Sequence, residues 1–120
     1  MPVRLEAVTV DCRDKHALAA FWCAVLGTTV RGELGQYLGL HPTAQGQPRL
    51  VFQQVTHLDP SRSRLHLDLE TDDIESETAR AVALGARVVT DVEELGTRWR
   101  VLEDPEGNPF CLVPREQVPD

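Results

Sequence analysis

The stretch LHLDLETDDIESETARAVALG (residues 65–85) decides the fold, because it holds a strand, a helix start and a helix stop in succession. Leucines alternate with polar residues over Leu65–Leu69, which predicts a strand with one face against a core. A polar segment with small and apolar residues then runs to Leu84, with the composition of an amphipathic helix. Gly85 follows as the residue that ends this helix.

The start of this helix has two candidate caps. Asp72 or Asp73 is the expected N-cap, and Glu75 would complete a capping box with Asp72. After the helix, short runs rich in β-branched and aromatic residues predict three more strands, at Ala86–Val92, Thr97–Leu102 and Phe110–Val113.

The same order of signals occurs earlier in the chain, where Val8–Val10 corresponds to Leu67–Leu69. We expect a strand at Leu5–Val10 and then a helix at Lys15–Leu26, between an N-cap at Asp14 and a terminating Gly27. Three strands follow, separated by turns at Gly32, Gly35 and residues 42–48; we place them at Thr28–Arg31, Gln36–Leu40 and Arg49–Val55.

The repeat predicts an α+β fold of two βαβββ modules, which form a curved mixed sheet around a cleft with the helices outside. A chain of 120 residues fits one domain. We expect residues 1–120 to be a single domain with module 1 at about 3–56, a polar linker at 57–63, module 2 at about 64–114 and a short tail at 115–120.

Composition excludes several classes of function. The 12 basic and 19 acidic residues give a net charge of -7 without any basic run, so neither nucleic acid nor an anionic membrane surface is an expected partner. No apolar stretch approaches the length of a membrane span, and the first residues do not resemble a signal peptide. Three widely spaced cysteines suit free thiols in a reducing cytoplasm.

Strand alternation assigns the faces of the second module. Leu65, Leu67 and Leu69 should lie against the helix, and the opposite face then carries His66, Asp68 and Glu70. Either a ligand site or a solvated outer face would account for these polar residues. On the first helix, Phe21 and Trp22 fall on the apolar stripe and are expected in the core, whereas His16, His41 and His57 are expected to be solvated.

The strings VDCRDKHALAAFWCAVLG, RLHLDL and WRVLEDPEGNPFCLV resemble the glyoxalase-like and bleomycin-resistance-like proteins of the vicinal-oxygen-chelate (VOC) superfamily, which are widespread in bacteria. The similarity extends from about Val3 to Pro114. Its most specific element is Asp104–Asn108, a tight turn rich in Pro and Gly that identifies the fold and not the chemistry.

The resemblance implies four inward positions that hold a divalent ion in metal-dependent members. They correspond here to Ala7, Gln53, His66 and Cys111. Alanine offers no ligand, so we expect no tightly bound metal and no other cofactor; any ion would use His66, Gln53 and Cys111, with Asp68 able to reach in.

Several residues are candidates for a ligand site. His66 and Asp68 are the candidate catalytic pair, because imidazole exchanges protons near neutral pH and a carboxylate can orient it. A purely structural histidine–carboxylate contact is the alternative. The full set of candidate ligand-binding residues is His66, Asp68, Glu70, Gln53, Cys111 and Trp99. Arg98 and Arg100 alternate to the face opposite Trp99 and would favour an anionic ligand if that face bound it.

Three functions remain open at this point. The chain is either a binding protein for a small, anionic or planar metabolite, a lyase or isomerase that uses His66 and Asp68, or a regulatory domain. A homodimer is expected, because short sheets leave edge strands that a two-fold partner can cover, and members of this superfamily frequently pair modules across a dimer.

Overall fold

The computed structural model describes residues 3–61 and 64–115. The chain divides into two compact units. Ala7–Leu65 form the N-terminal unit, and the residues from His66 onward form the C-terminal unit together with the start of the first strand, Arg4–Glu6. Among the described residues, no helix is long and apolar enough to span a membrane.

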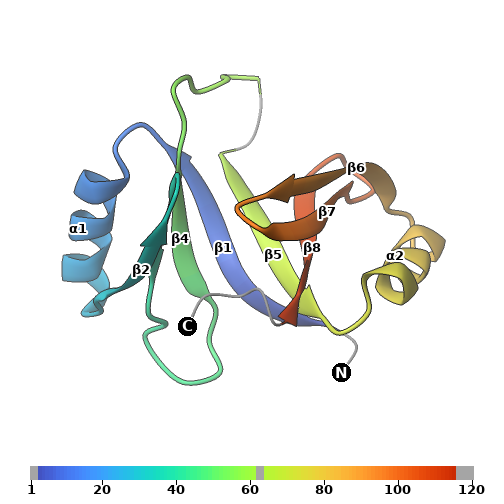
Figure 1. The fold of residues 1–120 in the computed structure, drawn as a ribbon, viewed down its shortest axis with the longest axis horizontal. Coiled ribbons are helices and arrows are strands. Elements are labelled where there is room, and N and C mark those ends of the chain that lie inside the picture. The colour runs from blue at the N-terminus through green and yellow to red at the C-terminus, as the bar shows by residue number, and fades with distance from the viewer. Residues whose placement is uncertain (1–2, 62–63, 116–120) are drawn as a thin grey trace. The chain divides into compact units, whose positions relative to one another are not determined.

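The N-terminal unit has its strands in the order β2-β3-β4-β1, with α1 beside them (Figure 1). β1 runs parallel to β4, whereas β2, β3 and β4 pair antiparallel. The elements are β1 (Arg4–Cys12), α1 (Lys15–Leu26), β2 (Val30–Leu34), β3 (Tyr37–Leu40) and β4 (Arg49–Gln54).

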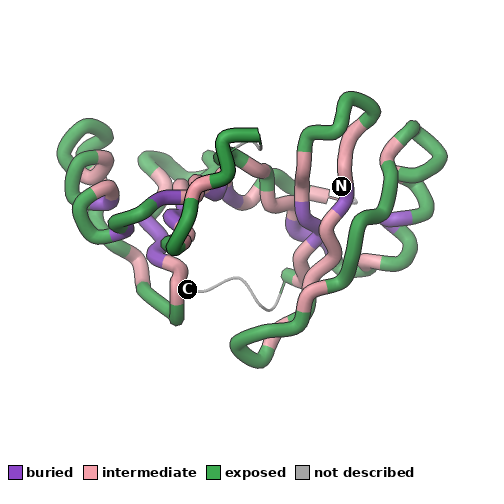
Figure 2. Tube along the Cα trace, turned by 90° about the horizontal axis from the view of Figure 1, so that it is seen from above, coloured by how far each residue is buried: buried purple, intermediate pink, exposed green. Residues whose placement is uncertain are grey.

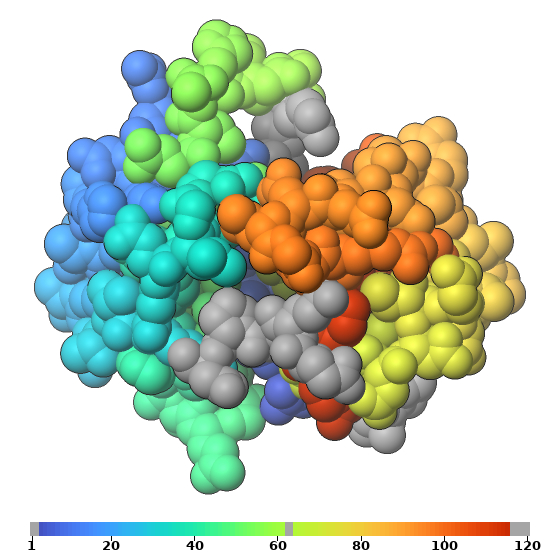
Figure 3. Space-filling model, viewed as in Figure 1, coloured from blue at the N-terminus to red at the C-terminus, as the bar shows by residue number. Residues whose placement is uncertain are grey.

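The C-terminal unit repeats this plan with the order β5-β8-β7-β6. β5 runs parallel to β8, and β6, β7 and β8 pair antiparallel. β6 is exposed along most of its length, as its orange surface in Figure 3 shows. The elements are β5 (Leu65–Thr71), α2 (Ile74–Ala83), β6 (Arg87–Glu94), β7 (Thr97–Glu103) and β8 (Pro109–Pro114). The predicted α+β class with a repeated βαβββ order is therefore confirmed.

The first helix begins and ends where the sequence predicts. The carboxylate of Asp14 accepts a hydrogen bond from the backbone N–H of Ala17 at 3.0 Å, as an N-cap does. Gly27 adopts a left-handed conformation with φ of 71°, which a side chain would disfavour.

The core of the N-terminal unit lies between α1 and its sheet. Most buried residues of this unit lie on its strands, whereas α1 is largely exposed (Figure 2). Leu18, Ala19 and Trp22 of α1 pack onto a cluster that holds Cys12, Leu38, Leu40 and Phe52. The prediction that Phe21 is in the core was wrong, because Phe21 is 56% exposed and its ring meets that of Trp22 in a T-shaped arrangement. Phe21 lies just beyond the part of the apolar stripe that reaches the sheet.

Two turn predictions in the first module have different outcomes. Gly35 has φ of 56° and forms the turn between β2 and β3, as expected. Gly32 does not form a turn, because β2 extends to Leu34 and pairs Gly32 with Gly39 beside a bulge. The predicted strand at Thr28–Arg31 therefore starts later and ends later in the structure.

Three details of the second module decide between alternatives of the sequence analysis or correct it. Asp73, not Asp72, is the N-cap of α2, because its side chain accepts from the backbone N–H of Ser76 at 3.0 Å. The expected capping box with Glu75 is therefore absent. Leu65 and Leu67 are 53% and 42% exposed rather than buried under the helix, because α2 packs mainly against β8 and β6.

The cap assignment gives a direct test. Asp73→Ala should lower the free energy of unfolding by about 1 kcal/mol, since the Ser76 N–H loses its acceptor. Asp72→Ala is the matched control, because Asp72 makes an exposed ion pair with Arg115 and should change stability by less than about 0.5 kcal/mol. Urea unfolding of both variants measures the difference. A larger loss for Asp72→Ala would contradict the assignment.

The expected linker and tail are only partly covered by the structure. Residues 57–61 of the linker are described, and residues 62–63 lie outside the described part. Of the predicted tail, Arg115 is described and residues 116–120 are not.

Candidate functional site

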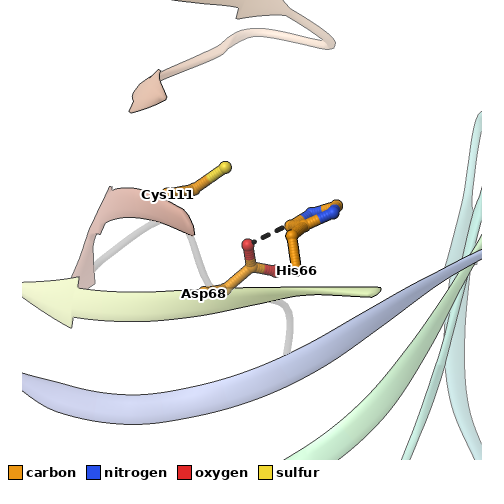
Figure 4. Close-up of side chains that lie close together, drawn as sticks. All are labelled: His66, Asp68 and Cys111. Atoms are coloured by element: carbon orange, nitrogen blue, oxygen red, sulfur yellow. Dashed lines mark ion pairs between the residues drawn. The ribbon is translucent and has the colours of Figure 1, made fainter. Parts of the chain in front are cut away.

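The candidate site of the C-terminal unit stands on two neighbouring parallel strands. His66 and Asp68 are two residues apart on β5, so strand alternation turns both side chains to the same face. Cys111 of β8 is the register partner of Asp68 and therefore shares that face. Figure 4 shows the three side chains projecting to one side of these strands.

The polar atoms of these residues form one cluster. Nε2 of His66 lies 3.5 Å from Oδ1 of Asp68, at the outer limit of a hydrogen bond (Figure 4). One ligand atom from each of His66, Asp68 and Cys111 lies within 4.8 Å of the other two. Both side chains of the His66–Asp68 pair are 21% exposed, so a small molecule can reach them while bulk water is largely displaced. We call these three residues the His66 cluster.

Cys111 is held in the thiol form. Burial, followed by the charge of Asp68, raises the pKa of the Cys111 thiol far above its usual range. A hydrogen bond from the thiol to the Asp68 carboxylate acts in the same direction, because it favours the protonated sulfur. Asp68 therefore stands between a donor thiol and an imidazole. This position suits a carboxylate that orients the ring of His66.

The other residues that the sequence analysis singled out on β7 lie on opposite faces of the sheet. Trp99 of β7 shares the face of the His66 cluster, because Val101, two residues on, pairs with Cys111. Arg100 pairs with Leu112 and lies on the α2 face, where its guanidinium binds Asp91 at 2.7 Å and Glu75 at 2.9 Å. The two arginines beside Trp99 therefore do not supply positive charge to the face of the cluster.

Glu70 lies on the same face of β5 as the His66 cluster, but other side chains of the protein bind its carboxylate. Its carboxylate is 3% exposed and accepts two hydrogen bonds from Arg4, at 2.6 and 3.1 Å. Arg115 lies 3.8 Å from the same oxygen. These contacts give Glu70 a structural role in holding the start of β1 within the C-terminal unit.

Two of the four metal positions implied by the resemblance lie in the N-terminal unit. Ala7 is buried and offers no donor, and the side-chain amide of Gln53 donates to the Tyr37 hydroxyl at 3.4 Å. Within the C-terminal unit, Asp68 joins His66 and Cys111 as the third donor. The cluster offers three ligand atoms, one nitrogen, one oxygen and one sulfur. Catalytic zinc sites, which keep one coordination position open, likewise have three protein ligands. The cluster fits such an ion only if the buried thiol first loses its proton.

Sequence comparison identifies the family of this fold. A family model described as a glyoxalase-like domain matches residues 7–113, which cover most of both units and include all three residues of the His66 cluster. The chain belongs to the glyoxalase-like domain family. The resemblance predicted from the sequence motifs is thereby confirmed. No curated protein matches this glyoxalase-like domain in sequence.

Solved structures of the VOC superfamily share the fold of this glyoxalase-like domain. A methylmalonyl-CoA epimerase in complex with methylmalonyl-CoA superposes with a TM-score of 0.73 at 21% identity, covering 100% of this chain and 99% of that one. A superfamily member from Vibrio splendidus gives 0.64 at 18% identity, covering 93% and 98%. The Mn(II)-bound glyoxalase from Novosphingobium aromaticivorans gives 0.65 at 17% identity, covering 93% of this chain and 38% of that one.

Proposed function

We propose that this glyoxalase-like domain binds a small oxygenated metabolite against the His66 cluster and Trp99. The observation that carries the proposal is the convergence of an imidazole, a carboxylate and a thiol within 4.8 Å on the sheet face away from α2. A planar ligand finds an aromatic ring in Trp99, and its oxygen atoms find a hydrogen-bonding partner in His66. The named ligand of the similar epimerase is likewise an oxygenated metabolite derivative.

Binding at the His66 cluster is tested by a ligand screen, followed by measurements on variants of the cluster and on a control variant. A panel of small oxo and hydroxy carboxylates is screened by thermal shift, and dissociation constants of the hits are measured by titration calorimetry. His66→Ala and Asp68→Asn should weaken binding about tenfold or more, the effect of losing a hydrogen bond to a charged group. His41→Ala is the control, because His41 is an exposed residue after β3. Equal losses in all three variants would contradict the proposal.

The second candidate is lyase or isomerase chemistry by proton transfer. The His66–Asp68 pair favours it, because a carboxylate at Nε2 leaves Nδ1 as the basic nitrogen of the neutral ring. His66 would take a proton from carbon beside a carbonyl and return it, while Asp68 keeps the ring oriented. Loss of the ligand's C–H proton NMR signal in D2O, abolished by His66→Ala, distinguishes this candidate from binding alone.

We propose that the site works without a tightly bound metal. Ala7 removes one of the four family positions, and the buried thiol of Cys111 opposes the deprotonation that a metal requires. An ion held by His66, Asp68 and Cys111 would supply Lewis-acid chemistry to a ligand oxygen. Elemental analysis of the purified protein decides the point, and about one zinc, nickel or iron per chain would overturn the proposal.

We also propose that the protein is cytoplasmic and that it forms a homodimer. Exposed apolar side chains at Val25 and Val30 of the N-terminal unit support an association surface. Sedimentation at micromolar concentration tests the dimer, and a mass matching one 13.4 kDa chain throughout would refute it.

A further inference from the structure

The side of α1 that faces away from its sheet is apolar. The segment Ala17–Leu26 holds no charged residue. Phe21 and Val25 are 56% and 58% exposed. Three alanines on the same side of the helix are exposed as well, namely Ala17, Ala20 and Ala24. A surface helix ordinarily carries charged and polar residues on this side. We call these five residues the outer face of α1.

The second module shows the same helix position with a polar surface. The N-caps Asp14 and Asp73 align the two helices, so that Phe21 of α1 corresponds to Arg80 of α2. The side chain of Arg80 is 51% exposed and forms an ion pair with Glu77. Both positions are therefore exposed, but α2 has a guanidinium where α1 has an aromatic ring. The apolar outer face is thus specific to α1 and is not a requirement of the repeated fold.

The outer face of α1 is complementary to a second copy of itself. Its side chains lie in rows of residues four apart, and rows of this kind interdigitate in the commonest class of helix packing. In an antiparallel pair centred between Ala20 and Phe21, each Phe21 ring packs over the partner's Ala20. Ala17 then meets the partner's Ala24. Large side chains thus face small ones, as a two-fold interface requires of a self-complementary surface.

The charges at the start of α1 also favour an antiparallel copy. Within Lys15–Leu26, both basic residues, Lys15 and His16, lie in the first turn, and the last turn has none. The helix dipole favours the opposite distribution. Lys15 contacts Glu33 at 2.7 Å and the Gly35 carbonyl at 2.6 Å, whereas His16 contacts Glu33 at 2.9 Å and keeps a side chain that is 65% exposed. An antiparallel copy brings His16 beside the last turn of the partner helix, where a basic group is stabilised.

We propose that two copies of the chain associate through the outer face of α1, with the two helices antiparallel. This inference rests on the homodimer proposed above and names its interface; it is independent of ligand binding at the His66 cluster. Chains with a net charge of -7 repel each other, so their contact surface has to be free of negative charge, as Ala17–Leu26 is. A helix that lies on a membrane carries Lys or Arg beside its apolar face, and this segment holds neither.

The interface is tested by sedimentation velocity of the full chain over micromolar concentrations, with one variant in each helix. Phe21→Arg gives α1 the residue that α2 has at the equivalent position. It should weaken association about thirtyfold or more, the effect of losing a central aromatic residue of an interface. Leu84→Arg is the matched control, because it introduces the same charge at a 71% exposed apolar residue at the end of α2. The control should sediment as the wild type does.

The outcomes separate this interface from the homodimer itself. A wild-type chain that stays monomeric throughout would refute both proposals. A dimer that withstands Phe21→Arg, or that Leu84→Arg weakens equally, would refute only the outer face of α1 as its interface. Urea unfolding of the dilute, dissociated chain should be nearly the same for the wild type and Phe21→Arg, because Phe21 is outside the core of one chain.

A pair of variants at Ala20 tests the antiparallel arrangement. Ala20 lies next to the proposed two-fold axis, so Ala20→Glu alone or Ala20→Lys alone brings two like charges together. Each variant should associate at least tenfold more weakly than the wild type, and an equimolar mixture of the two should recover a dimer, because opposite charges then meet. Glu and Lys are both good helix formers, so circular dichroism should show unchanged helix content. A mixture that associates no better than the separate variants would overturn the antiparallel pairing.

Discussion

Phe52→Ala is expected to lower the free energy of unfolding by about 3–5 kcal/mol, the cost of deleting a buried aromatic side chain and leaving a cavity. Phe52 has 0% exposure and lies in the cluster that α1 covers through Ala19 and Trp22. Such a loss is a large part of the stability of a chain of this size. Urea unfolding followed by circular dichroism measures it.

The control for this prediction is on the neighbouring helix. Phe21→Ala removes a side chain of the same size that is 56% exposed, so its cost should be below about 1 kcal/mol. A similar loss for both phenylalanines would contradict the placement of the core between α1 and the sheet.

Arg4→Met is the second change with a large expected effect, about 2–3 kcal/mol of unfolding free energy. The substitution removes both hydrogen bonds that Arg4 donates to the buried carboxylate of Glu70. The effect is below that of a fully buried pair, because the Arg4 side chain is 60% exposed and Arg115 remains near the carboxylate. Thermal and urea unfolding measure the loss.

A double variant distinguishes this pair from a simple loss of surface charge. Arg4→Met combined with Glu70→Met removes both partners, so no buried carboxylate is left without its arginine. The double variant should therefore be more stable than Arg4→Met alone. Additive losses from the two substitutions would show that the ion pair does not couple them.

The elements of this fold were predictable because their signals are local. Asp14 and Gly27 mark the ends of α1 by cap chemistry that needs only a few residues of context. Asp72 and Asp73 are equally good caps by residue type, and only the geometry of the chain entering α2 selects Asp73. The exposure of Phe21 likewise depends on how far the sheet extends beneath the helix, which periodicity does not contain.

Strand alternation alone predicted the candidate site only within one strand, and Cys111 was named through the family resemblance. Alternation along β5 places His66 and Asp68 together, and the structure confirms that the two side chains meet. The position of Cys111 beside Asp68 follows from the register between β5 and β8, which lie far apart in sequence. The role of Arg4 was missed for the same reason, because its partner Glu70 lies on another strand far along the sequence.

The division of β1 between the two units has a consequence for how the protein can be dissected. Arg4–Glu6 belong with the C-terminal unit, although Ala7 begins the other one. A fragment that starts at residue 64 would contain the repeat in full and still lack the arginine that its buried glutamate needs. The boundary of the sequence repeat is thus not the boundary of a stable fragment. Deleting the start of β1 would therefore damage the unit that comes second in the sequence.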